Sequence, residues 1–346
     1  MKEHFENQRP IGGEFELNPQ NFMSEAAQCG PLFSSGRAAY RAILRHVRQS
    51  GFDSIFLPDY LCDSVTEATT REGFRIETYK IGEGLSPEKS LLYRAAGRLI
   101  LVVDYFGLTD IGQTSAMVRD SGGIVIADLV QSPFAAKPAA ADYAFGGYRK
   151  YLAVPEGAYA FAGENTLIPE EPASEAGSIK ACGGLIKSIA REKKLSDRLY
   201  LDLFTIAENI FDKEELIAKA GRMAALLRNP ELDEEIKQRR KENFSILSQA
   251  IESIGLKPLV PAGPSAIPLA LPVAVKNRDI VRRMLMEERI YLPVHWPRLS
   301  GEGYCGFLSD HELSLVIDQR YGLKDMRRIA KALEKAGAMG ASYDHQ

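Results

Sequence analysis

The chain has 346 residues, of which 45% are hydrophobic and 26% charged, and its formal net charge is −3. These values are typical of a globular protein long enough for two domains, and they give no electrostatic reason to expect a nucleic-acid partner. No run of about 18 apolar residues occurs, so no membrane-spanning helix is predicted.

The amino terminus is polar and lacks the apolar core of a signal peptide, so we expect a cytoplasmic protein. The four cysteines and five histidines show neither disulfide nor metal-ligand spacing, and no metal site is expected. Residues 1–20 are polar, and we expect an arm that either packs on a neighbour or frays as a chain end.

The first predicted helix follows this arm. Ser34 or Ser35 is a good N-cap, and apolar residues recur at helical spacing from Ala39 to Val47. A Ser-Gly turn at the start of a helix presents free backbone N–H groups, to which a phosphate can bind. An ordinary capped helix is the alternative interpretation.

The run at 54–58 predicts a strand that ends at a proline, and the alternating residues 74–79 predict the next strand. Apolar runs at 99–103 and 124–128 predict buried strands. Strand and helix alternate from residue 32 to residue 132, as a parallel doubly wound sheet requires. The run at 99–103 ends in Asp104 and Tyr105. These two residues either border a pocket or close the strand with core contacts.

The run at 124–128 carries the most information about function. It ends in Asp128, Gln131 follows three residues later, and Lys150 lies further along among glycines and aromatic residues. A carboxylate at the carboxyl end of a strand lies where open α/β sheets bind ligands. Pyridoxal phosphate (PLP) catalysis needs a lysine for a Schiff base and an acid for the pyridinium nitrogen. A turn aspartate and a surface lysine are the ordinary alternative.

These residues resemble a known family. Asp128 to Gln131 is similar to the Asp-x-x-Gln signature of the DegT/DnrJ/EryC1/StrS aminotransferases, a branch of the fold-type I PLP enzymes, and residues 149–158 resemble their lysine segment. The resemblance extends over residues 30–330. It implies an α/β fold with an arm at 1–20, a large domain at 21–235 and a small α+β domain at 236–346. The large domain would hold PLP on a mostly parallel seven-stranded sheet.

The resemblance also implies roles for the site residues. Lys150 would hold pyridoxal 5'-phosphate as an aldimine and then act as the general base, which requires a lowered pKa. Asp128 would pair with the pyridinium nitrogen, and Gln131 would bond the 3-hydroxyl oxygen of the cofactor.

The phosphate site is implied in the same way. Ser35, Gly36 and Arg37 resemble the family's Ser-Gly-Thr phosphate-binding turn, with arginine in place of threonine. Many fold-type I enzymes carry a hydroxyl residue three positions before the lysine, where this chain has Gly147. Arg149 either replaces that hydroxyl by its charge or faces solvent.

A segment around residues 58–65 resembles one that lies near the cofactor in the family. Tyr60 is the aromatic residue expected to stack on the pyridine ring, although the family's usual stacking position falls on Cys62. Residues 301–306 satisfy a dinucleotide-binding pattern, but they do not join a strand to a helix in an early βαβ unit, so we expect no dinucleotide there.

The second half of the chain is predicted to be helical from 185 to 254, with Leu199, Leu203, Ile206 and Ile210 on one apolar face. A small carboxy-terminal unit follows. It has an apolar run at 266–275, a helix at 278–288, strands at 290–294 and 313–321, and a closing helix at 326–336.

The most specific hypothesis is a PLP-dependent aminotransferase, which moves an amino group from an amino-acid donor to a keto acceptor. Glutamate is a candidate donor, and a nucleotide-linked keto sugar is a candidate acceptor. The alternatives are another PLP reaction, such as a lyase or desulfurase, and a non-catalytic ligand-binding or regulatory protein. The resemblance and the base rate both favour a C2 homodimer with shared active sites. His295, Trp296, Arg298 and Arg320 either contact the substrate or are structural.

Overall fold

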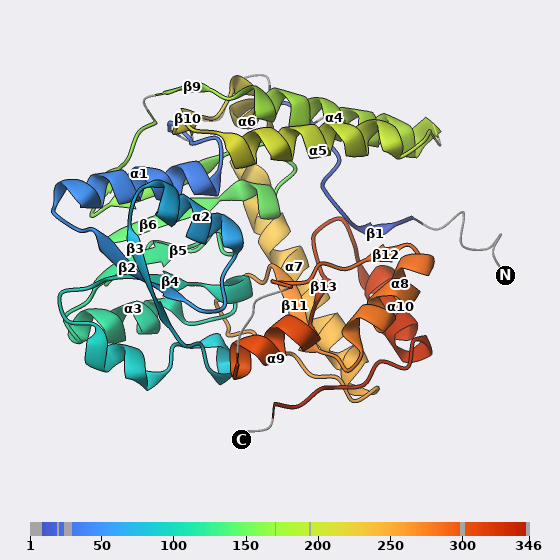
Figure 1. The fold of residues 1–346 in the computed structure, drawn as a ribbon. Helices are drawn as coiled ribbons and strands as arrows, with labels where there is room; N and C mark the ends of the chain where they lie inside the picture. Colours follow the sequence, from blue (N-terminus) through green and yellow to red (C-terminus); the bar gives the residue numbers. More distant parts are fainter. Residues whose placement is uncertain are drawn as a thin grey trace.

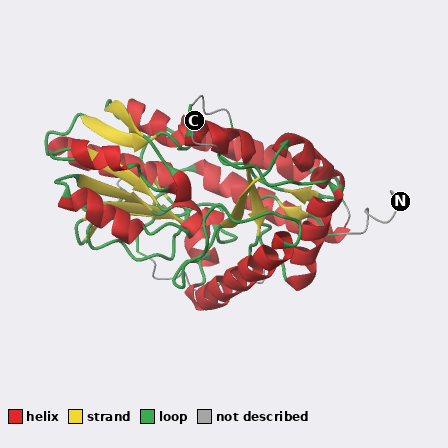
Figure 2. Ribbon diagram, turned by 90° about the horizontal axis from the view of Figure 1, so that it is seen from below, coloured by secondary structure: helices red, strands yellow, loops and turns green. Residues whose placement is uncertain are grey.

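The computed structural model describes residues 9–18, 21–23, 30–169, 171–193, 195–297 and 302–343. A large sheet with its helices is formed by the first half of this chain, and a smaller unit is formed by the last third (Figure 1). Helices surround the strands of both parts (Figure 2).

Seven strands form the large sheet in the order β3-β2-β4-β5-β6-β7-β8. They are β2 (Ser54–Pro58), β3 (Arg75–Tyr79), β4 (Leu99–Val103), β5 (Ile124–Asp128), β6 (Tyr143–Gly147), β7 (Ala158–Ala162) and β8 (Asn165–Thr166). The first five strands in this spatial order pair in parallel, and β7 and β8 are antiparallel. Every residue of β4 is buried, as expected for a parallel strand covered on both faces.

Helices α1 (Gly36–Gln49), α2 (Asp63–Arg71) and α3 (Ile111–Asp120) cover this sheet. Figure 1 shows α1 and α2 on one face and α3 on the other. Ser35 is the N-cap of α1: its side chain accepts a hydrogen bond from the N–H of Ala38 at 3.1 Å. The apolar face of α1 is buried, so packing fixes the start of this helix above the end of the sheet.

A helical segment joins the two parts. It contains β9 (Glu171–Ala173), α4 (Glu175–Lys193), α5 (Arg198–Lys213), β10 (Ala218–Lys219), α6 (Arg222–Leu227) and α7 (Asp233–Glu252). Helices α4 and α5 lie side by side, and α7 leads into the smaller unit (Figure 1). The boundary predicted after residue 235 falls in the first turn of α7.

The predicted apolar face of α5 is not the face that the helix buries. Tyr200, Phe204 and Phe211 are the large residues that α5 buries. Leu199 and Ile206 from the predicted face are 56% and 47% exposed. Helical spacing identified the apolar stripe correctly but did not show whether this chain covers it.

The smaller unit contains β11 (Ala270–Ala274), α8 (Arg278–Glu287), β12 (Ile290–Tyr291), α9 (Tyr304–His311), β13 (Glu312–Val316) and α10 (Leu323–Lys335). Strands β11 and β13 pair antiparallel. The amino-terminal strand β1 (Ile11–Gly12) pairs with β12, so this segment of the arm lies on this chain's own carboxy-terminal unit. Gly12 has a φ of +93°, and a Cβ there would lie 2.0 Å from the carbonyl oxygen of Tyr291.

The predicted fold class, a large mostly parallel seven-stranded sheet with α/β organisation, is confirmed. Strand β6 was missed, and the strand predicted at 313–321 is Glu312–Val316. No helix in the described part of the chain is both long and apolar enough to cross a membrane.

Candidate active site

A cavity of about 700 Å³ lies where the carboxyl ends of β4 and β5 meet the start of α1. Its other walls come from residues 12–15 of the arm and from the carboxy-terminal unit around β12 and β13. Ligands of open α/β sheets bind at this end of the strands, and the volume is that of a typical small-molecule site. The cavity is therefore lined by parts of the chain that are far apart in sequence.

Asp128 ends β5 and is almost fully buried in the cavity wall. One of its oxygens accepts the N–H of Val130 at 2.9 Å. Burial raises the pKa of Asp128 to about 6, although the Val130 N–H and the charge of Lys150 both act to lower it. No described residue bonds the second oxygen, so this carboxylate is available to a cationic N–H group in the cavity.

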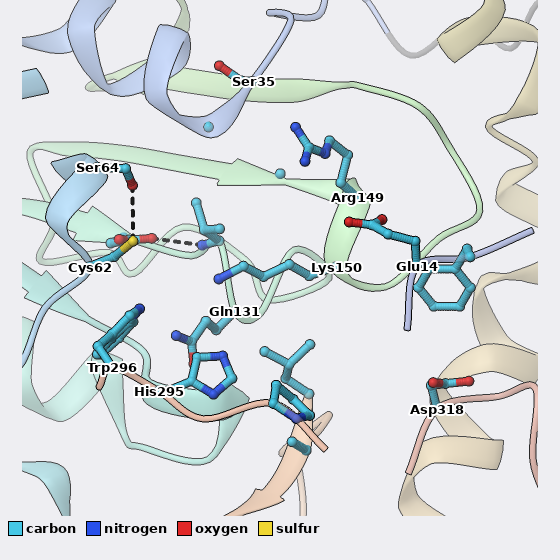
Figure 3. A pocket seen from close by; sticks show the side chains of 18 of the residues that line it. Glu14, Ser35, Cys62, Ser64, Gln131, Arg149, Lys150, His295, Trp296 and Asp318 are labelled. Atoms are coloured by element: carbon cyan, nitrogen blue, oxygen red, sulfur yellow. Dashed lines mark hydrogen bonds between the residues drawn. The ribbon is translucent and has the colours of Figure 1, made fainter. Parts of the chain in front are cut away.

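Lys150 follows β6 in a short 3₁₀ turn and extends across the cavity, with its amine directed toward Cys62 (Figure 3). Its Nζ makes no hydrogen bond or ion pair with a described residue. The protein surrounding the cavity desolvates the amine, and this lowers the pKa of Lys150, whereas Cys62 and Asp128 act to raise it. An amine without a partner and with a lowered pKa suits a nucleophile or a base.

Gln131 is held through its two oxygens, and no described residue accepts a hydrogen bond from its amide nitrogen. Its side-chain oxygen accepts the N–H of Phe106 at 2.6 Å, and its backbone carbonyl accepts the Tyr151 hydroxyl at 2.7 Å. Because the first contact uses the amide oxygen, the NH₂ group remains a donor. Figure 3 places this side chain beside Lys150, so it can serve an oxygen acceptor in the cavity.

The start of α1 forms an anion site at one end of the cavity. Ser35, Gly36 and Arg37 all line it, and no described residue uses the backbone N–H groups of Gly36 and Arg37. The guanidinium of Arg37 donates to the Phe211 carbonyl at 3.1 Å and to Asp212 at 2.7 Å. Its Nε is buried without a partner in the described chain. Such a helix start favours a phosphate or carboxylate.

Arg149 also lines the cavity, on the side of Ser35 (Figure 3). Its guanidinium donates to Glu208 and lies 4.9 Å from the centre of the Phe211 ring. Arg149 therefore adds positive charge near the anion site. Gly147 leaves space there, because a Cβ at this residue would lie 3.9 Å from the Gly36 nitrogen.

Tyr60 is not in the cavity wall, so the prediction that it stacks on a ligand ring was wrong. Its ring is fully buried 4.9 Å from the Trp296 ring, and its hydroxyl donates to the carbonyl of His295. Cys62, two residues later, lines the cavity instead, with its Sγ 3.1 Å from Ser64 Oγ. The chain turns between these two residues, where β2 gives way to α2.

Asp104 and Tyr105 also lie outside the wall, although their neighbour Val103 is part of it. The carboxylate of Asp104 turns into its own loop, where it accepts the backbone N–H and the hydroxyl of Thr109 at 3.2 and 3.0 Å. Of the two interpretations of this strand end, the structure supports the core one.

The carboxy-terminal unit contributes residues whose role the sequence left open. His295, Trp296 and Arg320 line the cavity, whereas Arg298 lies outside the described residues. Arg320 is held by Asp318 at 2.8 Å. Arg282 was not predicted. Its Nε donates to a backbone carbonyl at 2.8 Å, and no described residue bonds its other two nitrogens.

Comparisons with known proteins give structural similarity without sequence similarity. No protein-family model matches the chain, and no curated protein matches it. A DegT DnrJ EryC1 StrS aminotransferase from Brucella abortus superposes with a TM-score of 0.61 at 16% identity, over 88% of this chain and 85% of that one. A sugar aminotransferase from Micromonospora echinospora, CalS13, gives 0.61 at 14%, over 88% and 86%.

A third solved structure is Spr1654 from Streptococcus pneumoniae, named as a candidate sugar aminotransferase and solved in a PLP form. It gives a TM-score of 0.65 at 13% identity, over 94% of this chain and 93% of that one. At these identities the similarity establishes the fold. The chemistry of the site follows from its own residues.

Proposed function

We propose that this chain is a PLP-dependent aminotransferase of the DegT/DnrJ/EryC1/StrS type. The observation that carries the proposal is the convergence of four groups on one cavity: the Asp128 carboxylate, the Gln131 amide, the Lys150 amine and the start of α1. PLP presents four matching groups, which are a pyridine nitrogen, a phenolic oxygen, an aldehyde and a phosphate.

The hydrogen-bonding groups that no other described residue uses match the groups of this cofactor. Asp128 has an unbonded oxygen for the ring nitrogen, and Gln131 has a free NH₂ group for the phenolic oxygen. The N–H groups of Gly36 and Arg37 would hold the phosphate together with Ser35. The Lys150 amine has no hydrogen-bond partner among the described residues that it must give up before it reacts.

When bound, PLP supplies an electron sink for the charge that develops at the substrate's α carbon. The chain's residues then control protons. Asp128 would keep a proton on the ring nitrogen of a bound cofactor, because a cationic N–H beside a buried carboxylate satisfies both groups. Lys150 moves a proton from the substrate carbon, and its desolvated amine is neutral more often than an exposed lysine would be.

The proposed substrates are an amino-acid donor, such as glutamate, and a keto acceptor, with a nucleotide-linked keto sugar as the first candidate. Two observations support an anionic substrate of this class. Arg282 lines the same cavity, and no described residue bonds two of its guanidinium nitrogens. Structures with this fold also include sugar aminotransferases.

We also propose that two copies pair about a two-fold axis. Leu199 and Ile206 form an exposed apolar stripe on α5, and Ile189 on α4 is 50% exposed. Exposed apolar stripes of this kind mark protein interfaces, and cyclic dimers are the commonest assembly. The cytoplasmic location stays a prediction from the sequence.

The test is a half-reaction. The purified protein is loaded with PLP and mixed with single amino acids, and its absorbance spectrum is followed. We expect the cofactor to convert to its amine form, with a keto acid as the only released product. Release of sulfide or of a cleaved fragment would instead indicate a lyase or desulfurase, and a protein that binds no PLP would indicate a non-catalytic role. Keto-sugar nucleotides and simple keto acids are then compared as acceptors.

A further inference from the structure

Three side chains link the core of the carboxy-terminal unit to the cavity. Ser314 Oγ lies 2.5 Å from Oε1 of Glu312, and Nδ1 of His295 lies 2.8 Å from the same Ser314 oxygen. The other oxygen of Glu312 accepts the backbone N–H of His295 at 2.7 Å. Glu312 and Ser314 are completely buried on β13, and His295 lines the cavity. Of these three residues, only His295 is exposed to the cavity.

The surroundings of Glu312 determine at which pH its carboxyl group ionises. Glu312 forms no ion pair with a described residue, and burial raises its pKa to about 8, although the nearby Arg278 acts to lower it. Arg278 donates to the backbone carbonyl of Ser309. Tyr60 is also affected by this carboxylate: burial raises the pKa of its hydroxyl, and the charge of Glu312 acts in the same direction. Glu312 can therefore gain and lose a proton near neutral pH.

The histidine end behaves differently. Burial and the charge of Lys150 lower the pKa of His295 to about 3, so the ring stays neutral. His295 and Lys150 line the same cavity. Figure 3 shows His295 on the same side of the Lys150 chain as Gln131. A neutral imidazole carries one proton, on either Nδ1 or Nε2.

The single hydroxyl proton of Ser314 links the two ends. When Glu312 is ionised, Ser314 donates to it, the Nδ1–H of His295 donates to Ser314, and Nε2 is a bare acceptor. When Glu312 is protonated, its O–H donates to Ser314, Ser314 donates to Nδ1, and the histidine proton lies on Nε2. The protonation state of the buried carboxylate thus determines the tautomer of His295.

We propose that Glu312, Ser314 and His295 form a proton relay between the cavity and the buried carboxylate. A proton that arrives at Nε2 forms an N–H bond there, while the Nδ1–H bond breaks and its proton moves to Ser314 Oγ. The original hydroxyl proton of Ser314 moves to Oε1 of Glu312. One negative charge is neutralised on Glu312, and the imidazole is neutral before and after the transfer.

The proton donor assigned to this relay is the ammonium form of Lys150, and this assignment rests on the proposed function. Lys150 acts as a base only after it loses a proton. The relay accepts that proton, directly or through one water molecule, and returns it when the reaction requires an acid. His295 is thus a proton carrier beside Lys150, and Glu312 and Ser314 are positioning residues that act through it.

The relay is tested without cofactor by ¹⁵N NMR of histidine-labelled protein, which distinguishes the two neutral tautomers and the imidazolium. We expect the His295 proton to move from Nε2 to Nδ1 as the pH rises through the titration of Glu312, with no imidazolium present. Glu312→Gln and Ser314→Ala should abolish this change. Ser115→Ala removes a buried hydroxyl that has no hydrogen-bond partner among the described residues, and it should leave the change intact.

A His295 tautomer that does not respond to pH, or a response that persists in Glu312→Gln, would overturn the relay. So would an imidazolium signal across this pH range. In the PLP-loaded protein, Ser314→Ala should slow the half-reaction by about tenfold to a hundredfold, and Ser314→Thr should restore most of the rate. If the protein binds no PLP but the tautomer change occurs, the relay stands and the proposed function fails.

Discussion

The carboxylate of Asp128 and the amine of Lys150 line the same cavity. The charge of Lys150 acts to lower the pKa of Asp128, and the charge of Asp128 acts to raise the pKa of Lys150, so each favours the charged form of the other. The two residues come from neighbouring strands, since Asp128 pairs with Phe145 of β6 and Lys150 follows that strand. A flat heterocycle bound between them would meet an acid at its nitrogen and an amine at its aldehyde. The proposed chemistry depends on this arrangement.

Asp128→Asn should bind PLP but slow the half-reaction by about a hundredfold or more. The amide keeps the shape of the side chain, but it cannot stabilise a proton on the ring nitrogen. Stopped-flow absorbance with a saturating amino donor measures the rate.

The matched control for this substitution is Asp104→Asn. Asp104 is also a buried carboxylate at a strand end with a pKa of about 6, but it lies outside the cavity wall. We expect a rate close to that of the wild type. Equal losses in the two variants would mean that Asp128 acts only through general stability.

Gly147→Ser should tighten PLP binding. The residue has an extended backbone with a φ of −154°, and a new Cβ would have no neighbour nearer than 3.7 Å. A serine hydroxyl beside the Gly36 nitrogen would add a hydrogen bond to the phosphate, worth about 1.5 to 3 kcal/mol. The Kd for PLP should therefore fall about tenfold or more, as measured by fluorescence titration. Gly147→Ala adds the carbon alone, and equal affinity in the two variants would count against a phosphate at this place.

Ile206→Glu should convert the proposed dimer to a monomer, because it places a charge in the exposed apolar stripe of α5. Size-exclusion chromatography with light scattering gives the mass. Ile280→Glu is the matched control, since Ile280 is 52% exposed on α8, away from that stripe. A wild-type protein that is monomeric at micromolar concentration, or a dimer unaffected by Ile206→Glu, would contradict the proposed interface.

Glu312→Gln should make the stability of the cofactor-free protein less dependent on pH. Burial raises the pKa of Glu312 from 4.5 to about 8. Unfolding therefore releases a proton between these values, and the free energy of unfolding falls as the pH rises from 4.5 to 8. Within this range, the contribution of Glu312 falls by about 1.4 kcal/mol for each increase of one in pH.

Glu156 has a pKa raised to about 7 and contributes a decrease of the same sign, so the variant should lose part of the pH dependence and keep the rest. Urea unfolding at the two ends of the pH range measures the difference. Identical pH dependence in the variant and the wild type would show that Glu312 titrates normally.

Much of the large sheet could be predicted from the sequence, because β2, β4 and β5 are short apolar runs and β3 alternates apolar and polar residues. The run from Ile124 to Asp128 gave both the strand and the acid at its carboxyl end. Strand β6 was missed because Gly146 and Gly147 lower its apparent strand propensity. A Cβ on Gly146 would lie 2.3 Å from the Tyr159 hydroxyl, so close packing requires glycine there.

The cavity wall from the carboxy-terminal unit could not be predicted, because no local pattern reports a contact across the whole chain. His295 and Arg282 reach the cavity only through the packing of the smaller unit against the sheet. The choice between Tyr60 and Cys62 failed for a related reason. Resemblance located the segment, but the direction of each side chain depends on the turn between β2 and α2.

The central claim is that PLP bound in this cavity reacts with Lys150. The direct test is to incubate the protein with PLP, reduce it with borohydride, and locate the phosphopyridoxyl group by peptide mass spectrometry. The account predicts one stoichiometric modification, on Lys150, and none at that level in a Lys150→Ala variant that remains folded. Stoichiometric labelling of another lysine, or only scattered labelling of surface lysines, would contradict it.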